Sequence, residues 1–187
     1  VSKGLQFDDK FYYHRLTKED LDKKYIEDVW DYNNNLNILS TELKVDKDSI
    51  VLEENVSVDI QSYAAVNEQD YLFRVNVFNK LNYIPKRYRN RKLPLKISSG
   101  FKDEDIYHFT LPKGYIIAVL PPEKIMETKF GRYKVVFTKV DDNHFTYYRM
   151  FTLQENTYPK EDYKAYRSFM RSITKYDNTR IAINKKS

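Results

Sequence analysis

The stretch from Ile106 to Ile173 constrains the fold most, because its apolar residues switch from a period of two to a helical period. Alternation on both sides of the turn residues Asp141–Asn143 predicts an antiparallel hairpin over 133–153. Pro159, followed by two acidic residues, then begins a helix over about 159–176. The apolar stripe of this helix consists of Ala165, Phe169 and Ile173. The stretch therefore predicts a sheet closed by one amphipathic helix.

A second amphipathic helix is predicted over about 17–33. Thr17 is a suitable N-cap, and apolar residues recur four apart from Leu21 to Val29. The asparagines at 33–35 are expected to end it, since asparagine tolerates the left-handed conformation. Trp30 lies on the apolar face, so we expect it in the core and not as a ligand platform.

Alternating or apolar runs predict the remaining strands, and 16% aromatic residues fit a pleated surface. The fold class is therefore mainly β (α+β at the margin), an antiparallel arrangement with two peripheral helices. The strands at 56–60 and 71–77 are expected to pair, the run 115–120 to be buried on both faces, and Asp103–Asp105 to form a turn. The predicted strands are Leu36–Leu43, Val56–Ile60, Tyr71–Val77, Tyr107–Leu111, Tyr115–Leu120 and Ile181–Ile183.

Charge divides the chain into two halves. Residues 1–79 hold 9 Lys/Arg and 16 Asp/Glu, a balance of −7, and residues 80–187 hold 23 and 11, a balance of +12. We interpret 1–79 as an acidic linking region packed on the rest, and 80–187 as a basic β-domain closed by the C-terminal helix. The asymmetry fits either a half that binds polyanions or two halves that attract each other. Whether they form one domain or two stays open.

The sequence offers no recognisable catalytic constellation. It has no cysteine, only 3 scattered histidines and 4 glycines, and none of the motifs of serine hydrolases, phosphate loops or zinc sites. We therefore expect a non-enzymatic chain without metal or cofactor. Its longest apolar run, 115–120, is too short to span a bilayer, so no membrane insertion is expected. Val1–Gly4 contains neither an initiator methionine nor a signal peptide, which indicates a piece of a longer protein.

Basic and aromatic residues alternate between positions 83 and 92. This composition suits an acidic glycan or single-stranded nucleic acid, through ion pairing and stacking. The alternative is a solvated loop or a contact with the acidic half. Nucleic acid is the weaker candidate, because no nucleic-acid-binding motif accompanies the segment. The candidate surface-binding residues are Tyr83, Arg87, Tyr88, Arg89, Arg91 and Lys92.

Four short motifs, taken in order and spacing, resemble a known module. They are Arg91-Lys92-Leu93-Pro94-Leu95, Phe109-Thr110-Leu111-Pro112-Lys113-Gly114-Tyr115, Thr128-Lys129-Phe130-Gly131-Arg132-Tyr133, and Tyr158-Pro159-Lys160-Glu161-Asp162-Tyr163 with Phe169. The module is the uncharacterised C-terminal β-domain that follows a transglutaminase-like (cysteine-peptidase-like) domain in exported multidomain proteins of certain Gram-negative bacteria. Residues 17–77 are similar in layout to the region that links the two domains.

The resemblance implies a β-sandwich-like fold, a periplasmic, cell-surface or secreted location, and a parent with Cys-His-Asp machinery before Val1. This chain has no cysteine, so no catalytic residue carries over. The expected function is an accessory or interaction domain that stabilises or positions the upstream transglutaminase-like domain or another partner, a protein or a glycan. The alternative is a stand-alone binding module for an acidic glycan or other polyanion.

Overall fold

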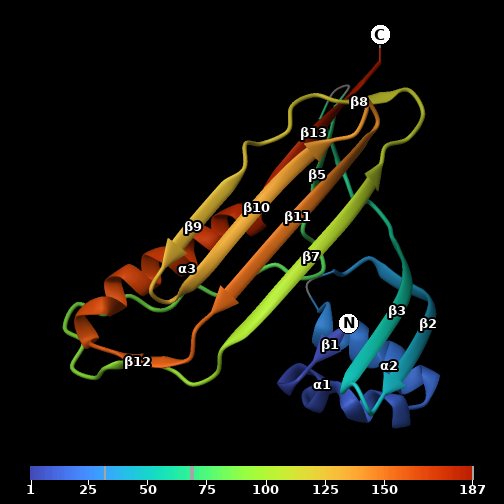
Figure 1. The fold of residues 1–187 in the computed structure, drawn as a ribbon. Helices are drawn as coiled ribbons and strands as arrows, with labels where there is room; N and C mark the ends of the chain where they lie inside the picture. Colours follow the sequence, from blue (N-terminus) through green and yellow to red (C-terminus); the bar gives the residue numbers. More distant parts are fainter. Residues whose placement is uncertain (32, 68–69, 187) are drawn as a thin grey trace. The chain divides into compact units, whose positions relative to one another are not determined.

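The computed structural model describes residues 1–31, 33–67 and 70–186 of the chain (Figure 1). Strands account for 43% of the residues and helices for 23%, which confirms the mainly β prediction. The chain divides into two compact units, Val1–Tyr63 and Ala64–Ser187. The division falls earlier than the charge-based one, so the residues from 64 to 79 belong to the second unit. By sequence, the first unit carries 8 Lys/Arg and 14 Asp/Glu, and the second 24 and 13.

The first unit is a three-stranded antiparallel sheet with short helices. The strand order is β1-β3-β2, and a bulge interrupts the β2–β3 register between Ile38 and Ser40. The strands are β1 (Ser2–Lys3), β2 (Leu36–Asp46) and β3 (Val51–Ile60). The helical segments are α1 (Leu5–Lys10), η1 (Phe11–Arg15), α2 (Lys18–Lys24) and η2 (Tyr25–Val29). Sequence analysis did not predict α1 or η1.

The helix expected over 17–33 begins as predicted and ends earlier. The Thr17 hydroxyl accepts a hydrogen bond from the backbone N–H of Asp20 at 3.1 Å, which caps the first turn. Its last turn widens into a π-helix, where the Trp30 N–H donates to the Tyr25 carbonyl at 2.8 Å. Trp30 stacks on the buried Tyr25 with ring centroids 5.0 Å apart, so it belongs to the core as expected.

The second unit is built on a long antiparallel sheet in the order β7-β11-β10-β9. Its strands are β7 (Phe101–Thr110), β9 (Lys124–Thr128), β10 (Gly131–Lys139) and β11 (His144–Leu153). The β10–β11 hairpin confirms the prediction for 133–153. The Asp141 carboxylate accepts from the backbone N–H groups of Asn143 and His144, which stabilises the turn.

The turn predicted at Asp103–Asp105 is wrong, because these residues lie inside β7. The alternation of the strand places Glu104 outward, where it pairs with Lys102, and Asp105 inward beneath the sheet. An inward carboxylate is stable only with a buried partner. That partner is supplied by β11.

A second four-stranded antiparallel sheet has the order β4-β5-β13-β8, and β12 pairs with β6. The strands are β4 (Ala65–Asn67), β5 (Asp70–Arg74), β6 (Leu95–Ile97), β8 (Tyr115–Ile117), β12 (Asn156–Tyr158) and β13 (Arg180–Lys185).

The pairing expected between 56–60 and 71–77 is wrong, since β3 pairs with β1 and β2 while β5 pairs with β4 and β13. The strand expected over 115–120 covers only Tyr115–Ile117, and the expected burial on both faces is wrong, since Val119 beyond its end is 76% exposed. The predicted last strand is confirmed as β13.

The C-terminal helix confirms the prediction for 159–176: a short 3-10 turn, η3 (Lys160–Asp162), leads into α3 (Tyr163–Asp177). It lies against one face of the long sheet (Figure 1), where the Phe169 ring meets the Phe151 ring edge to face at 6.2 Å. Near the opposite end of the same face, Phe73 of β5 contacts Phe109 and Phe145. The second sheet and the helix thus share the inner face of the long sheet, which gives the sandwich-like layering of this unit.

Candidate functional site

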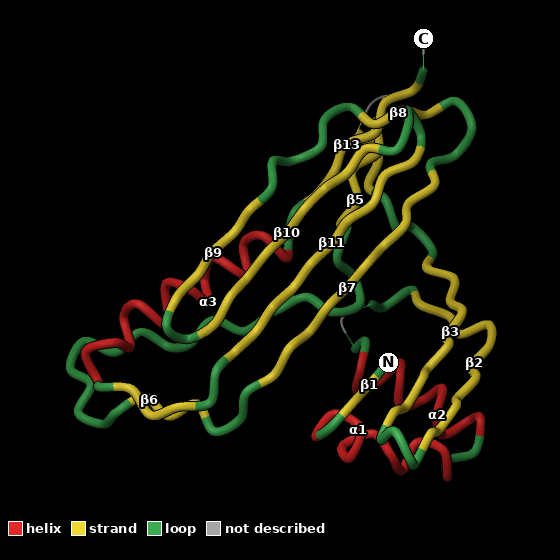
Figure 2. Tube along the Cα trace, viewed as in Figure 1, coloured by secondary structure: helices red, strands yellow, loops and turns green. Residues whose placement is uncertain are grey.

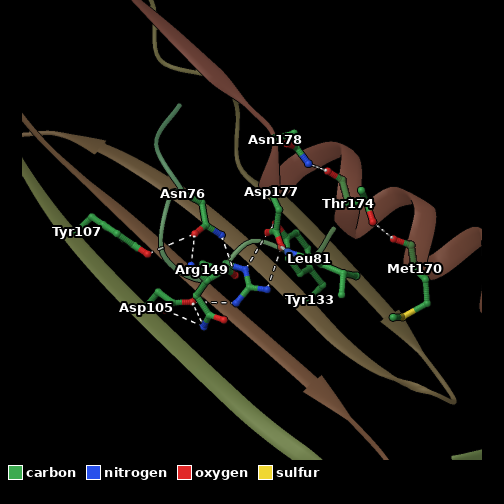
Figure 3. A network of polar contacts seen from close by, with 11 residues as sticks. Asn76, Leu81, Asp105, Tyr107, Tyr133, Arg149, Met170, Thr174, Asp177 and Asn178 are labelled. Carbon is green, nitrogen blue, oxygen red and sulfur yellow. Dashed lines mark hydrogen bonds and ion pairs between the residues drawn. The ribbon is translucent and has the colours of Figure 1, made fainter. Parts of the chain in front are cut away.

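Charged side chains converge at one place inside the second unit. Arg149, in the middle of β11, points inward and is only 1% exposed. Its Nε and Nη2 donate to the two carboxylate oxygens of Asp177 at 2.8 and 3.0 Å, and its Nη1 donates to Asp105 at 2.8 Å (Figure 3). One guanidinium therefore joins the edge strand β7, the central strand β11 and the last residue of α3.

The Asp177 carboxylate receives two further hydrogen bonds. The Tyr133 hydroxyl, from β10, donates at 2.7 Å, and the backbone N–H of Leu81 donates at 2.8 Å. Asp177 is 0% exposed, so all four donors belong to the protein and not to solvent. A buried carboxylate with a bidentate arginine and two additional donors has the partners that burial requires.

Two asparagines complete the network on its other side. The amide of Asn79 donates to both oxygens of Asp105, at 3.0 and 3.2 Å. Asn76, which is 0% exposed, exchanges two hydrogen bonds with the backbone of Asn79 and accepts one from the Tyr107 hydroxyl. The network thereby fixes the chain immediately after β5, where regular structure ends.

The pKa shifts in the network follow from burial and from these partners. Burial opposes the charge of Arg149, but the hydrogen bonds and charges of Asp177 and Asp105 outweigh it and raise the pKa of the guanidinium. Burial, and then the charge of Asp177, raises the pKa of the Tyr133 hydroxyl. Burial also raises the pKa of the Asp105 carboxyl, against the lowering effect of Asn79 and Arg149.

This arrangement is suited to holding the fold and not to turning over a substrate. A general acid or base must reach a reacting group within hydrogen-bond distance, whereas Arg149 and Asp177 are both buried and already paired with each other. Sequence analysis missed the network. The available signal was Arg149 itself, a charge at an inward position between the apolar Tyr147 and Phe151.

The basic segment named from sequence lies in a long connection. No helix or strand occurs between the end of β5 at Arg74 and the start of β6 at Leu95 (Figure 2). Such connections above about 12–15 residues are uncommon in compact domains and are usually functional or disordered. This one is held by α3, since Arg167 donates to the Pro85 carbonyl at 2.8 Å and the Tyr163 hydroxyl donates to the Lys86 carbonyl at 2.7 Å.

The structure separates the six candidate residues into two groups. Arg91 is engaged within its own segment: it donates to the carbonyls of Leu93 and Pro94 at 2.9 Å each, and its guanidinium lies 4.2 Å from the Tyr163 ring centroid. The Tyr88 ring lies 5.6 Å from that of Tyr163, so one side of it is partly covered. Both residues shape the segment as well as bordering its surface.

The other four candidates face solvent, and so does the uncovered side of Tyr88. Tyr83 is 60% exposed and Tyr88 is 55% exposed, and the side chains of Arg87, Arg89 and Lys92 are exposed beside them. Among the described residues, no hydrogen bond or ion pair engages the side chain of Arg87, Arg89 or Lys92. The structure thus presents three unpaired cations and two tyrosine rings on one ordered connection.

Two further features bear on chemistry. Within the ranges that the structure describes, no group of three or more histidine or carboxylate side chains is placed to hold a metal ion. The His144 ring contacts the carboxylate of Asp141 in the exposed hairpin turn, and this interaction helps lower the pKa of Asp141 after the larger effect of the Asn143 N–H. None of the described helices has the length and apolar character to cross a membrane.

Comparison with known proteins places the second unit in a family. No curated protein sequence matches the chain. A crystal structure of a candidate protease from Parabacteroides distasonis ATCC 8503 aligns with 21% identity over 48% of this chain and 19% of that protein, with a TM-score of 0.38. The chain thus corresponds to about a fifth of that protein's length. Residues 69–183 match a family described as a domain of unknown function with a solved structure, DUF3858. Because the match covers more than half of the sequence, the chain belongs to the DUF3858 family.

Proposed function

We propose that this chain is a non-catalytic accessory domain of a larger exported protein, in which it follows a transglutaminase-like (cysteine-peptidase-like) domain. The observation that carries the proposal is the closed state of the Arg149 network. The ionisable side chains that converge there are buried and satisfied by one another, at exposures of 1% for Arg149 and 0% for Asp177. Such a cluster determines the geometry of the fold.

The motifs that carry the family resemblance support the same role. Gly114 and Gly131 have positive φ angles, in a turn and at a strand start, and Pro159 leads into the C-terminal helix. The Tyr158 hydroxyl donates to the Lys129 carbonyl and joins two of the motifs. Gly114, Gly131, Tyr158 and Pro159 therefore all have structural roles in the fold. We therefore propose that the domain stabilises or positions its upstream catalytic partner, in the periplasm or at the cell surface.

Removal of residues 64–187 from the full-length parent tests this function. The parent's thermal midpoint, its location in fractionated cells and its rate on a small and a large substrate would be compared with and without the domain. We expect the rate on the small substrate to persist, while stability, location or the rate on the large substrate changes. If all of these are unchanged, the chain has no accessory role.

A second candidate function is the binding of an acidic glycan through the basic segment. The observation that favours it is the unpaired, exposed state of Arg87, Arg89 and Lys92 on a connection held in place by α3. Ionic binding of this kind weakens steeply with salt. Elution from a heparin column across a salt gradient, for the wild type and for Arg87→Glu/Arg89→Glu, tests it. Equal elution of both proteins would exclude this function.

A further inference from the structure

The exposed face of α3 carries a row of cations. Lys164, Arg171 and Lys175 are all exposed and lie seven and four residues apart, which places them along one line of the helix. No acidic residue occurs in α3 before its buried last residue, Asp177. None of the three cations takes part in an ion pair with a described residue. A charged helix face is usually only solvated, so this row alone does not identify a site.

The second observation is that the connection carrying the basic segment (residues 83–92) runs along the same helix before it reaches most of the cations of that segment. Its contacts with α3 proceed in the reverse order of the helix: the Leu81 N–H meets Asp177, the Pro85 carbonyl meets Arg167, and the Lys86 carbonyl meets Tyr163. Residues 81–86 therefore lie antiparallel to α3, from its end at Asp177 to its start at Tyr163, and the chain that follows stays near this start, where Arg91 lies on the Tyr163 ring. Between positions 71 and 102 the sequence contains no Asp or Glu, so the segment adds cations without compensating acids.

We propose that the α3 row and the basic segment form one extended binding face for a linear acidic polysaccharide. This inference rests on the second candidate function and names the ligand geometry of that site. Lys164 and Lys175 are separated by roughly 16 Å along the helix axis at the standard rise. An extended row of this length matches a chain of repeated carboxylates better than a single small anion. The arginines add planar donors that pair with carboxylates through two hydrogen bonds.

The aromatic residues favour a polysaccharide over single-stranded nucleic acid. Binding of single strands relies on successive rings on which bases stack. Tyr88 is partly covered by Tyr163 at 5.6 Å, and the Arg91 guanidinium lies 5.8 Å from the Tyr88 ring centroid. Tyr83 is the more exposed of the two candidate rings. Recognition on this face is therefore mainly ionic. Two acids just before α3 are already near cations, since Glu161 lies 3.9 Å from Lys160 and Asp162 pairs with Lys129.

Because the α3 row and the basic segment both carry cations, affinity should depend on the length of the ligand. A short oligomer contacts cations of either the α3 row or the basic segment. A longer oligomer reaches both, so its second contact forms within the complex that the first contact has already made. The full chain would be titrated with oligogalacturonates of about three and about twelve sugars, with affinity read by calorimetry. Oligothymidylate of similar length serves as the nucleic-acid comparison. Circular dichroism would show that each variant retains the wild-type fold.

The deciding variant is Lys164→Glu/Arg171→Glu, which lies outside the sequence-predicted segment. We expect it to weaken binding of the long oligomer by about tenfold or more and that of the short oligomer by less. The matched control, Lys18→Glu/Lys113→Glu, changes net charge equally at exposed positions elsewhere and should leave affinity within about twofold.

Three outcomes would overturn the inference. If the helix-row variant binds like the control while Arg87→Glu/Arg89→Glu weakens binding, the segment alone is the site, and the second candidate function survives without the extended face. If neither pair changes affinity, both ideas fail. If oligothymidylate binds more tightly than the long oligogalacturonate at equal salt, the ligand is a nucleic acid and not a polysaccharide.

Discussion

Arg149 and Asp177 face each other fork to fork, with Nε–Oδ1 and Nη2–Oδ2 distances of 2.8 and 3.0 Å in a fully buried position. The first residue belongs to the central strand pair of the long sheet, and the second ends the C-terminal helix. The pair therefore determines where the helix stops against the sheet. It also positions the connection after β5, because Asp177 accepts a hydrogen bond from the Leu81 N–H.

Replacing Arg149 with methionine should be strongly destabilising. The substitution leaves the carboxylates of Asp105 and Asp177 buried without their cation. Breaking a buried pair in this way costs about 3–5 kcal/mol. Urea unfolding followed by circular dichroism measures the loss.

The matched control is Arg132→Met on the neighbouring strand β10. Arg132 pairs with Glu127 at 2.9 Å, but the two side chains are 49% and 65% exposed. Exposed pairs contribute about 0–1 kcal/mol, so the unfolding free energy should hardly change. Equal losses for the two variants would show that burial of the Arg149 network is not the source of its effect.

Two buried tyrosines should respond differently to loss of the hydroxyl. The Tyr133 hydroxyl donates to Asp177, so Tyr133→Phe should cost about 1.5–3 kcal/mol, as expected for a hydrogen bond to a charged group. The Tyr147 hydroxyl is buried near Tyr133 but forms no hydrogen bond with any described residue. Tyr147→Phe should therefore leave the unfolding free energy unchanged or raise it by up to about 1 kcal/mol. A larger loss for Tyr147→Phe than for Tyr133→Phe would refute this assignment.

Arg91→Lys should loosen the basic segment without unfolding the domain. Lysine lacks the planar fork that reaches the carbonyls of Leu93 and Pro94 and lies on the Tyr163 ring. We expect trypsin to cleave the segment about tenfold faster, since local opening becomes easier. Arg89→Lys keeps the same cleavage chemistry and should digest like the wild type. Identical digestion of the two variants would show that Arg91 does not hold the segment.

Gly114 and Gly131, two of the three glycines with positive φ, provide a further comparison. A Cβ added at Gly131 would lie 1.9 Å from the Thr152 carbonyl oxygen, whereas one at Gly114 would meet nothing within 4 Å. Gly131→Ala should therefore cost more than about 3 kcal/mol, and Gly114→Ala only about 1–2 kcal/mol for the left-handed backbone. Thermal unfolding of both variants measures the difference, and a similar midpoint for the two would contradict the close approach of β10 to β11.

Alkaline pH should unfold the protein through its tyrosines. Burial raises the pKa of the hydroxyls of Tyr25, Tyr133 and Tyr147, with Glu54 acting next at Tyr25 and Asp177 at the other two. Above about pH 10 the unfolded chain loses these protons while the folded chain keeps them. Each such tyrosine then lowers the unfolding free energy by about 1.4 kcal/mol per pH unit. The last part of the phenolate absorbance, which comes from the buried tyrosines, should rise together with unfolding. Ionisation of all 17 tyrosines near pH 10 in an intact fold would oppose this prediction.

Local signals explain what could be predicted from the sequence. The turn residues Asp141–Asn143 and Pro159 influence the backbone only within a few residues. The hairpin and the C-terminal helix could therefore be predicted from the sequence. The order of the sheets depends on contacts between distant residues. Nothing near Ile181–Ile183 in sequence indicates that β13 lies between β5 and β8. The run Asp103–Asp105 was misread for the same reason, because the cation that allows Asp105 to point inward lies on another strand.

The candidate surface was only partly accessible from sequence. The sequence shows the basic residues between 83 and 92. It does not show that Arg91 stabilises its own segment by donating hydrogen bonds to the carbonyls of Leu93 and Pro94. The row from Lys164 to Lys175 was visible as helical spacing, yet its place beside the segment depends on Tyr163 and Arg167 contacting carbonyls far away in sequence. These contacts form only when α3 packs on the sheet.

The most direct test of the proposed accessory function is the catalytic rate of the proposed transglutaminase-like parent when the buried network is altered. In the full-length protein, Tyr133→Phe and Asp105→Asn remove network groups while keeping side-chain shape. Hydrolysis or transfer on a small fluorescent peptide would be measured per folded molecule, with folding followed by circular dichroism. A non-catalytic domain predicts kcat/KM unchanged within about twofold for both variants. A loss of about a hundredfold or more in kcat/KM, with the fold intact, would place catalysis in this chain and contradict the account.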